Sequence, residues 1–246
     1  YHETLRAGLV LTKNRTKLKF AHRPASPGFN GLGATTKTFG DIPDVTALTA
    51  PIRTLMEIAF QCTDDLAAFS RLAGKDPNAA STIEGLLLLP TEAWPPQAQA
   101  NLTTLVSNVK EGPITLSLVE ICSALGKADA PLSKDRVRHL AKILESHHIG
   151  TEPNVLEGAR LPTDMDPVVL FEMLPEQSHH ADNDAFQTAL LTLQVASTMA
   201  QADGQFSNTE VAHLTREIET WIHLNPSSRK RLHAHLQLLT TAPITL

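Results

Sequence analysis

The sequence predicts an all-α fold, a multi-helix bundle preceded by a basic N-terminal arm that is mostly non-helical. Of its 246 residues, 42% are hydrophobic but only 4% are aromatic. A composition led by Ala and Leu favours helix packing over sheets, which are enriched in β-branched and aromatic residues. Apolar residues recur at three-to-four spacing through most of the chain, and Pro or Gly breaks divide it into helical lengths.

Residues 1–42 form the predicted arm and linker. Residues 1–40 hold seven Lys or Arg against one acid, a balance of +6, whereas the whole chain carries −5, which leaves −11 for the rest. Basic and apolar residues alternate over residues 16–20, a pattern typical of a strand, so this part can pair as a small ribbon. Basic residues at this density suit nucleic-acid phosphate or an acidic partner surface. The alternative is a solvated arm that folds against the acidic body.

Residues 43–178 are predicted to be a helical region. Its expected helices cover residues 44–72, 95–109, 114–125 and 168–174, with a short helix ending before Pro90 and another closed by Gly150 as a C-cap. The apolar positions of these helices are predicted to form the core.

The two cysteines indicate the redox state of the cellular compartment. Cys62 and Cys122 lie in apolar helical patterns without C-x-x-C spacing, which indicates reduced thiols in the cytoplasm. No apolar stretch approaches the length of a membrane span. Because the sequence begins with Tyr rather than Met, we expect a fragment or a processed chain.

The most informative stretch covers residues 195–214. An apolar helical run ends at Asp203 and Gly204, since glycine readily adopts the left-handed conformation that closes a helix. Ser207 and Glu210 then fit a capping box, with Ser207 as N-cap, so a second helix is predicted to start there. The carboxylates of Asp203 and Glu210 flank this break, which we call the acidic corner (residues 202–214).

Two interpretations of these carboxylates are open. A capping glutamate and a solvated turn aspartate need no ligand. Alternatively, both converge on a hard divalent cation, calcium or similar, with further oxygens completing a shell of about 6–8 ligands. An EF-hand is excluded because Gly204 directly follows Asp203.

An enzyme would need more than this corner. Asp203, Glu210 and His213 could form a metal-assisted hydrolase centre, but the chain shows no nucleophile motif and no phosphate-binding loop. We therefore expect no catalytic residues and no enzymatic activity.

The A-D-G-x-x-S-x-x-E pattern of the acidic corner resembles the TerB module of tellurite-resistance and stress proteins. The resemblance implies an all-helical module in which Asp203 and Glu210 are acidic metal-binding positions. Upstream segments resemble the TerB-N type region found beside TerB in larger bacterial proteins; they are residues 22–27, 64–72, 86–90 and 148–154. The chain is then expected to contain a TerB-N-like region over residues 43–178. Residues 179–246 would form a partial TerB-like module, because a full module carries a second acidic half.

This resemblance implies a non-catalytic accessory module of a bacterial tellurite-resistance, stress or phage-defence type system. Such a module would bind a divalent cation through Asp203 and Glu210 and contact other protein components of the system. The alternative is a metal-free protein-interaction scaffold, with a possible nucleic-acid contact through residues 1–40.

An internal repeat accompanies the corner. Residues 128–140 align with residues 202–214 at an offset of 74, matching Ala, Asp, Ser, Val, His and Leu. Arg136 replaces Glu210 in this first corner (residues 128–140), so the same helix–turn–helix architecture is expected there in a structural or partner-binding role. The basic run at residues 229–231 stands near a predicted helix start, where positive charge is unfavourable, and indicates an outside partner or solvent.

Overall fold

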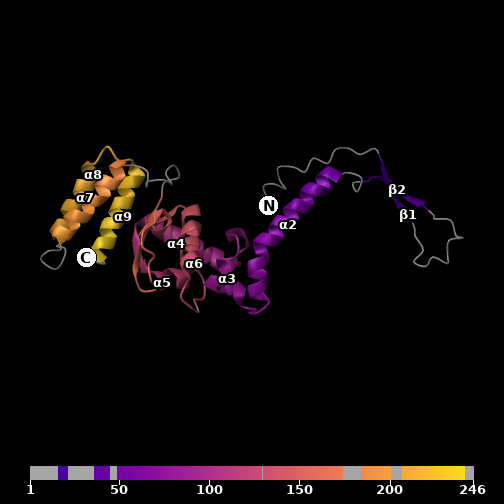
Figure 1. The fold of residues 1–246 in the computed structure, drawn as a ribbon, viewed down its shortest axis with the longest axis horizontal. Helices are drawn as coiled ribbons and strands as arrows, with labels where there is room; N and C mark the ends of the chain where they lie inside the picture. Colours follow the sequence, from indigo (N-terminus) through magenta and orange to yellow (C-terminus); the bar gives the residue numbers. More distant parts are fainter. Residues whose placement is uncertain are drawn as a thin grey trace. The chain divides into compact units, whose positions relative to one another are not determined.

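A computed structural model describes residues 16–21, 36–44, 49–128, 130–173, 184–200 and 207–241 (Figure 1). The chain divides into two compact units, Tyr1–Ala68 and Phe69–Leu246. The fold is mixed α/β, because helices accompany two antiparallel sheets of two and three strands. The predicted all-α fold class is therefore wrong.

The first unit contains the ribbon expected in the basic arm. Strand β1 (Lys17–Ala21) pairs antiparallel with β2 (Thr36–Pro43), and the pairing shifts register between Lys17 and Lys19. The predicted ribbon is thus confirmed. Helix α2 (Thr49–Ala73) begins in this unit and runs past its boundary as one continuous helix.

The described part of the second unit combines helices with a three-stranded sheet. Its helices are α3 (Ile83–Leu86), α4 (Pro96–Glu111), α5 (Leu118–Leu125), α6 (Lys134–Ser146), α7 (Asp184–Ala200), α8 (Asn208–Thr220) and α9 (Pro226–Thr241). Its strands are β3 (Ile114–Ser117), β4 (Ile149–Glu152) and β5 (Pro167–Glu172), and β5 lies between the other two, antiparallel to both. The 3₁₀ turns are η3 (Ala79–Ser81), η4 (Thr91–Ala93) and η5 (Val155–Glu157). None of the described helices is long and apolar enough to cross a membrane.

The central strand, β5, explains why the all-α prediction was wrong. A helix was predicted over residues 168–174, but β5 occupies most of this stretch. Val168 and Leu170 face one hydrophobic cluster, while Val169 and Phe171 face another. Since both faces of the strand are buried, its sequence is a continuous apolar run without polar alternation, and such a run does not distinguish a strand from a buried helix.

Two neighbouring boundaries also differ from expectation. The helix predicted over residues 114–125 begins with β3, and α5 starts only after Ser117, whose hydroxyl accepts a bond from the backbone N–H of Glu120 at 3.3 Å. Gly150 lies within β4, opposite Phe171, and is not a helix C-cap. A Cβ at Gly150 would lie 2.4 Å from the Phe171 ring, so glycine leaves the room that this ring occupies.

The second unit has separate hydrophobic clusters. The largest joins α3, α4, α5 and α6 with one face of the sheet and includes Trp94 and Cys122. A second cluster lies among α7, α8 and α9, which run side by side (Figure 1). A small third cluster places Ala234 of α9 against Val169 and Phe171. Helix α9 therefore joins the C-terminal helices to the sheet.

Candidate functional site

The described half of the acidic corner is a helix start. Ser207 has extended backbone angles, and its hydroxyl accepts a bond from the Glu210 backbone N–H at 3.2 Å. The Glu210 Oε2 accepts bonds from the Ser207 backbone N–H at 2.8 Å and from its hydroxyl at 2.7 Å. The predicted capping box and the start of α8 are confirmed.

These bonds favour the ionised form of the Glu210 carboxyl. The side-chain bond from Ser207, followed by the backbone bond from the same residue, lowers the pKa of the Glu210 carboxyl below its ordinary value. The carboxyl is therefore ionised at neutral pH. Both bonds fall on Oε2, so Oε1 takes neither of them.

Asp203, the other predicted ligand, lies outside the described residues, and so do residues 201–206 as a whole. The distance between the Asp203 and Glu210 carboxylates is therefore not described. Within the ranges that the structure describes, no three His, Cys, Asp or Glu side chains lie together in a way that could hold a metal ion. The pair Asp203 and Glu210 stays a prediction.

The first corner uses the matching helix start differently. Ser133 has N-cap backbone angles at the start of α6, but its side chain makes no capping hydrogen bond. Arg136, which stands where α8 has Glu210, instead donates to the Glu84 carbonyl and pairs with the Glu84 carboxylate at 3.0 Å. An arginine has no acceptor atom for the N-cap donors, so Arg136 cannot complete a capping box. Its contacts with Glu84 instead tie α6 to α3.

The basic run at the start of α9 has intramolecular partners. Arg229 pairs with Glu219 at 3.4 Å, and Lys230 pairs with Glu172 at 2.8 Å. Arg231 pairs with a third glutamate, Glu152, at 3.3 Å. The outside partner considered for these residues is therefore not needed to account for them.

Arg231 belongs to a buried polar cluster that sequence reasoning missed, formed by Glu152 of β4 with Arg231 and His235 of α9. The three residues are only 6%, 5% and 8% exposed. Glu152 Oε1 lies 2.9 Å from His235 Nδ1, and Glu152 Oε2 accepts a bond from Arg231 Nη1 at 3.3 Å. One carboxylate thus holds two side chains of the same helix.

Further contacts fix this cluster in place. Arg231 Nη1 also donates to the Thr151 carbonyl at 3.2 Å, and its guanidinium lies over the Phe171 ring, 5.2 Å from the centroid. The other ring nitrogen of His235 lies 3.3 Å from the Gln194 amide of α7. Because the charged groups are paired and nearly inaccessible to solvent, the arrangement suits cohesion between β4, α7 and α9 rather than contact with a substrate.

The sequence contained a partial signal for this cluster. Three consecutive basic residues at a helix start are locally unfavourable, which indicated an outside partner or solvent for residues 229–231 but no partner within the chain. No sequence pattern paired Glu152 with Arg231, because the two residues stand 79 positions apart in the chain.

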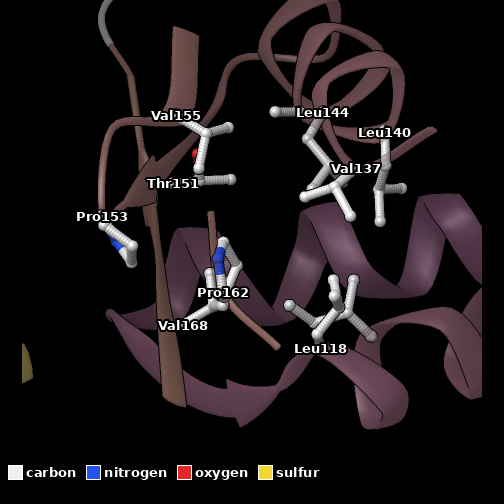
Figure 2. A pocket seen from close by; sticks show the side chains of 11 residues that line it. Leu118, Val137, Leu140, Leu144, Thr151, Pro153, Val155, Pro162 and Val168 are labelled. Carbon is white, nitrogen blue, oxygen red and sulfur yellow. The ribbon is translucent and has the colours of Figure 1, made fainter. Parts of the chain in front are cut away.

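A small apolar pocket lies in the largest hydrophobic cluster (Figure 2). Its volume is about 20 Å³, room for about one water molecule. The lining residues are Leu118, Ile121, Val137, Leu140, Ala141, Leu144, Thr151, Pro153, Val155, Pro162 and Val168. Aliphatic walls with a single hydroxyl offer no set of groups for catalysis or for a cofactor.

Comparisons with family models, with curated proteins and with solved structures found no match for this chain. The TerB resemblance of the acidic corner therefore stays a prediction.

Proposed function

We propose that the chain is a non-catalytic accessory module of a bacterial tellurite-resistance, stress or phage-defence type system, acting in the cytoplasm through protein contacts. Its acidic corner binds a divalent cation weakly through Asp203 and Glu210. The observation that carries the cation proposal is the state of Glu210, whose carboxylate is ionised and held at one oxygen by Ser207. The other oxygen takes no part in the cap.

Exposed apolar side chains of α7 support the contact role. Leu191, Val195 and Met199 recur every four residues and are all exposed, and residues four apart in a helix share a face. This face runs along the helix that precedes the corner. A partner protein bound there would contact the helix that precedes the acidic corner in the chain.

The cation proposal is tested by thermal melts of EDTA-treated protein titrated with calcium, magnesium, manganese or zinc. A ligand at 100 times its dissociation constant adds about 2.7 kcal/mol to the free energy of unfolding when it binds only the folded state. We expect one of these ions to raise the melting temperature of the wild type. Asp203→Asn and Glu210→Gln should each abolish that rise, since each removes one negative ligand.

Matched variants separate the metal role from the cap. Glutamine preserves a capping box, so Glu210→Gln keeps the helix start and changes only the charge. Ser207→Ala breaks the box but keeps both carboxylates, and its melting temperature should still rise with the ion. Glu217→Gln, on the same helix, should respond like the wild type. No shift with any ion in the wild type would contradict the cation proposal.

The second candidate is a metal-free protein-interaction scaffold. It is favoured by the small number of acidic ligands, since no group of three possible ligands occurs among the described residues. This candidate predicts identical melts with EDTA and with each ion, for the wild type and for all three variants of the corner.

A further inference from the structure

The β1–β2 ribbon carries an aromatic and basic face. Phe20 lies directly opposite Lys37 in the antiparallel pairing, and opposed residues lie on the same face of a sheet. Phe39 lies two residues after Lys37 in β2, and residues two apart in a strand point to the same face. Phe39 is therefore on the face of Phe20 and Lys37. The Lys37 Nζ lies 5.8 Å from the centroid of the Phe39 ring, consistent with this placement. Phe20, Lys37 and Phe39 are called the aromatic face below.

This face is open. Phe20 is 57% exposed and Phe39 is 40% exposed. Two strands form a single layer, and such a ribbon is at best marginally stable by itself in water. Exposed aromatic rings on a ribbon therefore suggest a surface that acquires stability by binding.

The charge around the face is positive. Lys19 pairs with Thr38 in the register, so it lies on the opposite face of the same ribbon and adds to the positive charge of the ribbon. Lys17 pairs with Asp41 at 2.7 Å, but an ion pair between such exposed groups is weak and is readily exchanged for a phosphate. Residues 1–40 carry seven basic residues against one acid, which favours an anionic partner.

We propose that the aromatic face of the ribbon binds single-stranded nucleic acid, an activity beyond the proposed function of the acidic corner. Bases stack on Phe20 and Phe39, and Lys37 of the same face contacts a phosphate, while Lys19 adds positive charge from the opposite face. Sequence-tolerant proteins of this kind combine aromatic stacking platforms with a basic track. A duplex hides the faces of its bases within its own stack, and an acidic peptide offers charge but no stacked bases, so both fit the two phenyl rings less well.

Fluorescence anisotropy with the full chain tests this proposal. The probes are a labelled oligo-dT of about 15 nucleotides, within the site sizes typical of such proteins, and a duplex of the same length. We expect preference for the single strand. Phe20→Ala and Phe39→Ala should each weaken its binding by about tenfold, the loss typical of one stacked base. Phe60→Ala removes an exposed phenylalanine of α2 and should leave binding unchanged.

Salt dependence tests the lysines. Each phosphate neutralised on a single strand contributes about 0.7 to the slope of log affinity against log salt. Lys37→Ala should therefore reduce the magnitude of the slope by about 0.7, and Lys19→Ala, on the opposite face, should reduce it less. Lys75→Ala/Lys134→Ala removes two exposed lysines elsewhere and should leave it unchanged.

Three results would overturn the proposal. One is no binding of oligo-dT by the wild type at about 100 μM, the weak limit of ordinary non-specific binding. Another is equal binding of the duplex with no loss in the phenylalanine variants, which indicates charge attraction alone. The third is displacement of oligo-dT by polyglutamate as efficiently as by unlabelled oligo-dT at equal charge, which indicates an acidic protein surface as the partner. Unchanged melting of every variant serves as the folding control.

Discussion

Glu210 and Glu152 are two glutamates in opposite settings. Glu210 is solvent-accessible, and both bonds to its carboxylate come from Ser207, three residues away. Glu152 is only 6% exposed, and its carboxylate binds Arg231 and His235, 79 and 83 residues away. One carboxylate fixes a helix start, whereas the other fixes how a helix packs on a sheet. The separation in sequence between contacting residues decides which of these contacts a sequence pattern can predict.

The two settings also differ in energy. A solvent-accessible carboxylate that loses its cap donors is hydrated instead, so the change is modest. A buried charge without its partner has neither water nor a counterion, and removing one member of such a pair is strongly destabilising. This difference orders the expected effects of the following variants.

The largest loss is expected for Glu152→Gln. It leaves the charge of Arg231 buried without its counterion, which should lower the free energy of unfolding by about 3–5 kcal/mol. Urea unfolding at neutral pH, followed by the fluorescence of Trp94 and Trp221 in their separate clusters, measures the change. Glu172→Gln is the matched control, because its pair with Lys230 is much more exposed, and it should lose at most about 1 kcal/mol.

A double variant sharpens this test of the buried pair. Glu152→Gln/Arg231→Met removes both charges, so it should be more stable than the sum of the single losses predicts, by about 0.5–3 kcal/mol. Strict additivity would contradict a direct pairing of the two charges. A loss in Glu152→Gln no larger than that in Glu172→Gln would remove the distinction between buried and accessible carboxylates.

A smaller loss is expected for Ser207→Ala. Removing an N-cap hydroxyl costs about 1 kcal/mol of folding stability, and thermal unfolding followed by circular dichroism measures it. The first corner supplies the control, because the Ser133 side chain makes no capping hydrogen bond. Ser133→Ala should therefore change stability less. Equal losses at the two serines would contradict the different roles of the two corners.

The smallest expected effect is a change of melting temperature at acidic pH. The folded pKa of Glu210 is below its ordinary value of 4.5, so the ionised carboxylate stabilises the fold above that pH, and the contribution is lost as the pH falls through the folded pKa. The melting temperature of the wild type should exceed that of Glu210→Gln near neutral pH, and the gap should close between pH 4.5 and more acidic values. A gap that stays unchanged in acid would show that the cap does not depend on the charge.

Local patterns predicted the elements that depend on neighbours in sequence. The capping box at Ser207 and the helix start near Pro96 needed only residues within one turn, and both are found. The ribbon was predicted from the alternation over residues 16–20, which occurs because one face of a strand differs from the other. The same rule failed for β5, because that strand is buried on both faces.

The sequence by itself determined the helix starts at Pro96 and after Ser207, the positive charge of the arm and the position of the acidic pattern, since each depends on residue types a few positions apart. Only the tertiary structure decided that Arg231 and His235 meet Glu152, that Arg136 meets Glu84, and that Gly150 makes room for Phe171. These contacts join residues far apart in the chain. Their partners are chosen by the packing of whole elements, which no local spacing encodes.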